Sequence, residues 1–372
     1  MAKAKKKLLP KDFEALLKKS DLEALKAIFD TCEVDARGGL FKQTTLAFNE
    51  CPDELARWLV DRGADLSAGD SYGDTPLHSR ARHWQGRIEI LLELGADVNH
   101  GENFRGTPLH SAAGSYKVSA ARVLIEHGAR ADALNRENQT PLVYALQRCN
   151  NTDIVTMAQL ADLLLQAEEQ KPTKKKSFVM SLFGAGQKEK AKITPEMKAF
   201  VTRIGTNFEF HRNTFNPEYL AATSAGLDRL YNLFDVSPVP RRSMHDGKSP
   251  IVVQAARWQD RHQELWELLV PSSGYSDTVQ GEVIRISGKI RNELEGNGGV
   301  NWDAGFKKMA DAFVLHIGSG VPLPNAELVE ARKIIGEVKG RSGNTSRMCE
   351  LAVNWVALNA KPAKLPPPAY GR

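Results

Sequence analysis

The sequence predicts a mainly all-α protein, in which a stack of short helix pairs is followed by a mostly helical domain. The first observation is a recurring phrase: Thr75-Pro76-Leu77-His78, then Thr107-Pro108-Leu109-His110, and in part Thr140-Pro141-Leu142. The second is a Gly-Ala phrase with the same spacing, at residues 63–65, 95–99 and 128–129. The third is the helical spacing of apolar residues in the second half, as in residues 279–294.

Both phrases return about every 33 residues, and a period near 33 with Thr-Pro-Leu-His marks the ankyrin repeat. Over residues 12–170 the chain therefore resembles an ankyrin-repeat protein. The resemblance implies units of one turn and two antiparallel helices, stacked as a solenoid. Such arrays present extended concave surfaces and mostly bind other proteins.

Each residue of the phrase has a physical role. Thr75 is placed to cap the first helix of its repeat, and Pro76 occupies the first helical position, where a missing N–H costs nothing. The resemblance implies that His78 and His110 bond backbone in a neighbouring turn; the alternative is a metal or catalytic role. Gly95 ends the second helix as a left-handed cap residue.

The flanking units carry weaker signatures. Residues 12–32 have the pattern of an amphipathic helical pair, as expected of an N-terminal cap. A first repeat opens at Thr44, without Pro or His, and a last one opens at Thr140, with a late second helix at residues 155–166. We count four repeats plus the cap. Arg80 departs from the family pattern, which usually has a small Ala there, and this puts the packing of the second repeat in question.

Composition indicates an ordinary soluble protein with several segments. Hydrophobic residues make up 42% and charged residues 26%, and no apolar run approaches the length of a membrane span. The first residues lack the apolar core of a signal peptide, and the four cysteines form no CxxC pair, so a cytoplasmic location without metal or cofactor is expected. The expected segments are a basic tail (1–11), ankyrin repeats (12–170), a Lys-rich linker (171–193), a helical domain (194–361) and a Pro-rich tail (362–372).

The net charge of +5 comes from two short stretches. Residues 1–11 and 172–192 together carry more positive charge than the whole chain, so the remainder is mildly acidic. That balance makes nucleic acid an unlikely partner. The basic stretches are interpreted as solvated tail and linker, and the alternative is weak contact with nucleic acid or an anionic membrane surface.

The second half is expected to be helical from residue 194 onward. Helix starts are predicted at Thr194-Pro195, Asn216-Pro217, Ser249-Pro250, Val279, Asp303, Asn325 and Asn344. Four of the six tryptophans lie here, at positions 258, 266, 302 and 355, and their helical surroundings favour core positions over a ligand platform.

The candidate catalytic residues of the second half are scattered along the sequence. His245 could act as a general base if folding brought it beside Glu282 or Asp303. Glu282 and Arg285 are one helical turn apart and are expected to pair on the surface. The glycine-rich turn at residues 296–303 matches neither a phosphate-loop nor a dinucleotide pattern. We therefore predict no catalytic residue and a protein that is not an enzyme.

The repeat register, taken from the family, predicts a binding surface. The residue three places before each repeat Thr projects from the hairpin loop, and aromatic residues at exposed positions are typical binding anchors. The residues after the small positions of each first helix line the concave side. The predicted partner-binding residues are Phe41, Tyr72, Asp74, His83, Trp84, Phe104, Arg105, Tyr116, Glu137 and Arg148. The alternative is that these aromatic residues stack on each other or cover the second domain.

The sequence thus predicts an interaction module that binds a protein partner through a preformed concave surface. One form of this function is an inhibitor or immunity-type protein that covers the cleft of a partner enzyme. A second hypothesis is an enzyme whose catalytic C-terminal domain receives substrate recruited by the repeats. A third is an adaptor that reaches a membrane surface through its Lys-rich segments.

Overall fold

The computed structural model describes residues 4–19, 21–101, 103–169 and 193–370. The chain divides into two compact units. The first comprises Met1–Asn207 and Asn216–Val239, and the second comprises Phe208–Phe215 and Pro240–Arg372. The Lys-rich linker expected at residues 171–193 lies outside the described residues apart from Ile193. The described chain is mainly helical, which confirms the predicted fold class.

The cap combines the expected helical pair with a small sheet. Helices α1 (Phe13–Lys19) and α2 (Leu22–Thr31) bury Phe13 and Phe29 edge to face, with ring centroids 6.4 Å apart. Strand β2 (Cys32–Gly38) pairs in parallel with β1 (Lys6–Leu8) and antiparallel with β3 (Gln43–Thr44). The expected basic tail is therefore corrected in part, because its residues 6–8 are held in the sheet by main-chain pairing.

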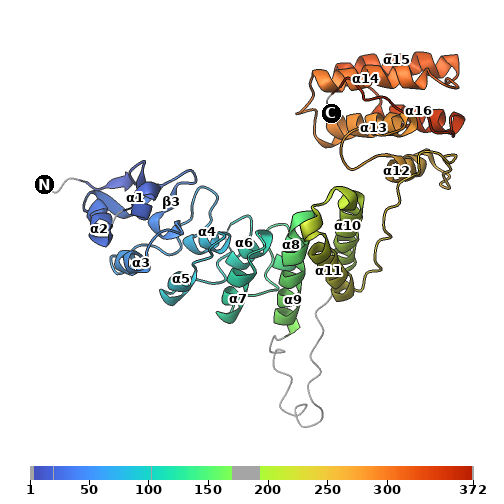
Figure 1. Cartoon of the computed structure of the whole chain (residues 1–372). Coiled ribbons are helices and arrows are strands. Elements are labelled where there is room, and N and C mark those ends of the chain that lie inside the picture. Colours follow the sequence, from blue (N-terminus) through green and yellow to red (C-terminus); the bar gives the residue numbers. More distant parts are fainter. Residues whose placement is uncertain (1–3, 20, 102, 170–192, 371–372) are drawn as a thin grey trace, which may run out of the picture. The chain divides into compact units, whose positions relative to one another are not determined.

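Helix pairs follow the cap in register with the sequence period (Figure 1). The first pair is η1 (Thr45–Ala47) with α3 (Asp53–Val60), and the second is α4 (Pro76–Ala81) with α5 (Glu89–Glu93). The third is α6 (Pro108–Gly114) with α7 (Val118–Glu126), and the fourth is α8 (Pro141–Arg148) with α9 (Ile154–Glu169), preceded by η2 (Asn151–Asp153). First helices pack on first helices along the stack, as α4 on α6 and α6 on α8.

The repeat histidines link each ankyrin-type repeat to the next repeat by a hydrogen bond. Nε2 of His78 donates to the carbonyl of Gly106 at 2.9 Å, and Nε2 of His110 donates to the carbonyl of Gln139 at 3.0 Å. Since Nε2 carries the proton, Nδ1 of His78 accepts from the hydroxyl of Thr75, 2.8 Å away. These contacts confirm the structural role predicted for both histidines.

A further helix pair continues the first unit after residue 193. Helix α10 (Pro195–His211) and helix α11 (Pro217–Phe234) follow the fourth repeat, and α11 packs along α9. The guanidinium of Arg203 donates to the carbonyl of Gln147 at 2.7 Å, and Asn207 donates to Asn151 at 2.9 Å. The structure therefore groups most of residues 194–239 with the repeats, which corrects the expected start of the helical domain at residue 194.

The second unit is built from five α-helices in its described residues. They are α12 (Trp258–Leu269), α13 (Val279–Arg291), α14 (Ala304–Ile317), α15 (Asn325–Lys339) and α16 (Thr345–Leu358), with the short η4 (Arg212–Thr214) and the π-helical η5 (Asn292–Gly296). Trp302 and Trp355 lie in the core, as predicted, while Trp258 and Trp266 are half-buried. The helix expected to open at Ser249 starts only at Trp258, because Ile251 instead donates its N–H to the carbonyl of Ala360.

The segment expected as a Pro-rich tail packs on the second unit over its described residues. Leu365 and Tyr370 are buried, and Lys364 forms an antiparallel bridge with Thr278. Two apolar anchors and main-chain pairing hold residues 363–370 on the second unit.

Candidate functional site

A groove of about 590 Å³ lies near the N-terminal end of the first unit, and we name it the aromatic groove. It draws on the cap, the first three repeats and the hairpin loops between them. Its lining residues are Glu14, Phe41, Gln43, Ala47, Phe48, Asn49, Glu50, Asp70, Tyr72, Ser79, Arg82, His83, Trp84, Arg105 and Lys117. Five of the ten residues predicted from the repeat register, Phe41, Tyr72, His83, Trp84 and Arg105, therefore meet at one surface.

Exposed rings dominate the groove. Tyr72 is 58% exposed and Trp84 is 74% exposed. Phe41 and Tyr72 contact each other at a centroid distance of 5.8 Å, and His83 lies 6.0 Å from Trp84. The alternative that the aromatic residues stack on each other thus holds for Phe41 and Tyr72. Both rings nevertheless keep a large accessible face, which is the condition for contact with a partner.

A buried carboxylate organises the basic side of the groove. Asp74 is fully buried and pairs with the guanidinium groups of Arg82 and Arg105, the second at 3.4 Å. Asn103 donates to the same carboxylate at 2.7 Å. Arg105 also lies over the ring of Tyr72, with its Cζ 5.3 Å from the centroid. The prediction that Asp74 meets a partner directly is therefore wrong: Asp74 orients two arginines that are themselves partly exposed.

The other predicted contact residues lie outside the groove lining. Phe104 and Glu137 are exposed on their hairpin loops. Tyr116 is half-buried, and its hydroxyl donates to the carbonyl of Ala145 at 3.1 Å. Arg148 is exposed and lies over the ring of Tyr144, 4.3 Å from the centroid. The structure leaves these four residues as separate surface positions, and their role in binding stays a prediction.

The repeat register could not place part of the groove lining. Glu14 comes from α1 of the cap, which carries no repeat phrase, and Phe48 and Glu50 come from the first repeat, between η1 and α3. Lys18 pairs with Glu14 at 3.2 Å and with Glu50 at 3.6 Å. The lining therefore contains these two carboxylates, both paired with Lys18, together with arginines of the repeats.

Arg80, the departure from the family pattern, is fully buried beside the groove. Its Nε donates to the carbonyl of Leu46 at 2.8 Å, and its Nη1 donates to the carbonyl of Arg87 at 3.1 Å. Burial lowers the pKa of Arg80, and burial raises the pKa of the neighbouring Cys51 thiol to about 11. Arg80 thus joins the first repeat to the second through main-chain carbonyls, where the family usually places Ala.

In the second unit, the residues considered for catalysis hold structural positions. Glu282 and Arg285 do form an ion pair, at 2.7 Å, but both side chains are buried, which corrects the expected surface pair. Asp303 accepts from the N–H of Phe306 as the cap of α14. The N–H of His245 donates to the carbonyl of Leu268. Among the described residues, no group of three or more His, Cys, Asp or Glu side chains is arranged to hold a metal ion.

Burial acts to raise the pKa of Glu282, but hydrogen bonds from Arg285, Ser276 and Tyr370 more than offset it and hold the pKa below its ordinary value. The carboxylate accepts four hydrogen bonds from these three residues, at 2.7–3.0 Å. A carboxylate with this many donors stays ionised and is a poor proton acceptor. Glu282 therefore has a structural role in the second unit, because its carboxylate links Ser276, Arg285 and Tyr370.

Comparison with known proteins agrees with the stack of helix pairs. Residues 86–167 match the family model described as "Ankyrin repeats (3 copies)". This region is made of ankyrin repeats. Among solved structures, an ankyrin repeat domain from Acinetobacter baumannii AYE is 27% identical, with a TM-score of 0.34, over 41% of this chain and 79% of that chain. No curated protein matches.

Ankyrin repeats are modules for protein–protein interaction, so a protein partner follows for this part of the chain. None of the described helices combines the length and the apolar character that crossing a membrane requires.

Proposed function

We propose that the protein binds a protein partner through the concave ankyrin surface, with the aromatic groove as its centre. The observation that carries the proposal is the meeting of exposed Tyr72 and Trp84 with Arg105 in one groove. Tyr, Trp and Arg are the residue types most enriched among binding hot spots. Because Asp74 holds the arginines in place before binding, little side-chain freedom remains to be lost on association.

The groove lining carries charges of both signs. Glu14 and Glu50 line it together with Arg82 and Arg105. A partner segment that carries both basic and acidic groups would match these charges. Charge complementarity of this kind fixes orientation and raises the rate of association more than it raises affinity. We place this interaction in the cytoplasm, because all four cysteines are buried free thiols.

Affinity capture with the full chain tests the proposal. Replacing two hot-spot rings, Tyr72→Ala with Trp84→Ala, should weaken partner binding by about 2 kcal/mol or more, which is about 30-fold in Kd. The matched control is Tyr219→Ala on α11, because Tyr219 is 56% exposed and lies outside the groove lining. Equal loss in both variants, or no loss in the double variant, would refute the groove as the binding centre.

Inhibition of a partner enzyme is a narrower form of the same proposal. It predicts that the captured partner loses activity when the wild-type protein is added, and keeps it with the Tyr72→Ala, Trp84→Ala variant. A captured enzyme that stays fully active in the complex would exclude the inhibitory form and leave the binding proposal intact.

A further inference from the structure

The last described stretch, residues 363–370, lies along the second unit in extended form, and we name it the terminal strap. The N–H of Val279 donates to the carbonyl of Ala363 at 2.8 Å, and the N–H of Leu365 donates to the carbonyl of Asp277 at 2.9 Å. Thr278 and Lys364 form the bridge between these bonds. The strap is thus added to the segment before α13 by main-chain pairing, as a bound peptide is added to an exposed edge.

Two side chains anchor the strap, and two of the three prolines between them are exposed. Leu365 is 6% exposed and Tyr370 is 7% exposed, whereas Pro366 and Pro367 are exposed. The hydroxyl of Tyr370 donates to Oε1 of the buried Glu282 at 2.8 Å. Main-chain pairing combined with a few inserted side chains is the way that extended ligands gain affinity and specificity together.

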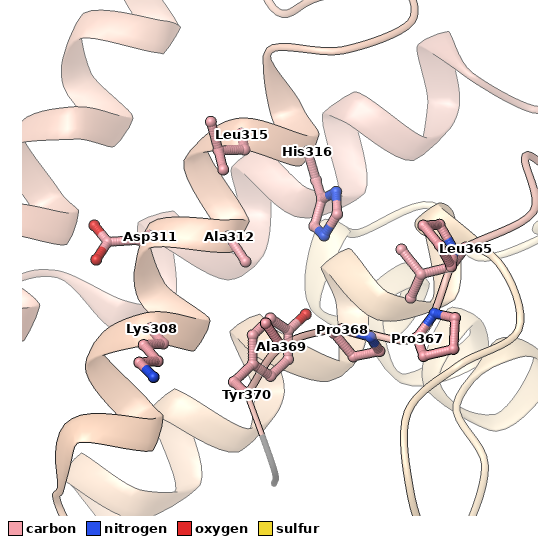
Figure 2. Close-up of a pocket in the computed structure, with 11 residues that line it drawn as sticks. Lys308, Asp311, Ala312, Leu315, His316, Leu365, Pro367, Pro368, Ala369 and Tyr370 are labelled. Atoms are coloured by element: carbon pink, nitrogen blue, oxygen red, sulfur yellow. The ribbon is translucent and has the colours of Figure 1, made fainter.

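A surface hollow of about 350 Å³ lies between the strap and α14. It is open to solvent, since Leu315 in its lining is 74% exposed. Figure 2 shows Ala312, Leu315 and His316 of α14 across from the strap. This volume lies within the range of sites that bind small ligands and peptide side chains.

We propose that the face of α13 and α14 beneath the strap is a peptide-binding groove, and that the strap is its resident intramolecular ligand. The external occupant that we assign is the strap of a second copy of this chain, because its fit to the groove is the one that the structure displays. Exchange of straps would link two copies through Tyr370 and Glu282. The proline run favours such exchange, since proline-rich segments are pre-ordered and lose little entropy on binding.

A labelled, amidated peptide of residues 360–370 tests the proposal, with binding measured by fluorescence anisotropy. The full chain with Leu365→Ala and Tyr370→Ala has a weakened resident strap, and it should bind the peptide at least about 10-fold more tightly than the wild type, where the tethered strap competes at high effective concentration. The matched control carries Lys364→Ala, at an exposed strap position that does not line the hollow, and should resemble the wild type. A peptide with Tyr370→Ala should bind none of the three proteins.

Equal binding by the anchor variant and the wild type would overturn the proposal, and so would equal binding of the Tyr370→Ala peptide. If the anchor variant does not fold, hydrogen exchange of the wild type decides the matter. The amide of Leu365 should then exchange at least about 10-fold faster than core amides of α13, because the strap opens separately from global unfolding. Equal exchange rates would show that the strap is a permanent part of the core.

Discussion

Acidification should destabilise the ankyrin stack through His78. The ring is buried, its Nε2 donates to the carbonyl of Gly106, and its Nδ1 accepts from Thr75. Burial lowers the pKa of His78 from 6.5 to about 4; the carboxylate of Asp74 acts in the opposite direction, and the nearby His100 adds to the lowering. A protonated ring would place a charge where the neutral ring is fully bonded.

The lowered pKa sets the sign and the size of the effect. The unfolded chain takes up the proton more readily than the folded one, so the stabilisation by neutral His78 is fully present above pH 6.5. It is lost as the pH falls from 6.5 towards 4. The gap between the two pKa values corresponds to roughly 3 kcal/mol, at about 1.4 kcal/mol per pH unit.

Urea unfolding of the full chain at pH 7.5, 5.5 and 4.5 measures this effect against a His78→Gln variant, which keeps an amide donor but cannot titrate. The stability difference between wild type and variant should shrink by about 1.4 kcal/mol per pH unit below pH 6.5, because other titrating groups cancel in the comparison. A difference that stays constant across this range would refute the argument that neutral His78 supports the stack.

Two further predictions concern single packing sites. Gly106→Ala should destabilise the first unit by about 2–4 kcal/mol in urea unfolding, because φ is +97° and a Cβ would lie 2.7 Å from Nδ1 of His110. Gly95→Ala is the control, because its φ is +94° but nothing lies near the added Cβ. It should cost only about 1–2 kcal/mol in the same titration. Glu282→Ala should destabilise the second unit by about 3–5 kcal/mol in thermal unfolding, because it removes the carboxylate that pairs with the buried guanidinium of Arg285. Replacing Glu282 and Arg285 together by Leu should cost less, and a larger loss in the double variant would contradict this account.

The groove could be predicted in part, because the repeat register placed five of its fifteen lining residues. Tyr72 and Trp84 hold positions that the Thr-Pro-Leu-His phrase defines, so their exposure follows from local spacing. Asp74 occupies an equally regular position, but its burial depends on Asn103 and Arg105 in the next repeat. Position along the repeat therefore predicted five of the residues that gather in the groove, and contacts between repeats bury Asp74.

The sequence by itself determined the helix pairs, their period and the role of the repeat histidines, because these depend on interactions within one repeat or between adjacent ones. Only the tertiary structure decided that β1 joins the cap, that α10 and α11 extend the stack, and that Tyr370 reaches Glu282, 88 residues away. Contacts between such distant segments depend on which apolar and polar groups complement each other after folding. A local sequence pattern does not specify which distant segments will pack against each other.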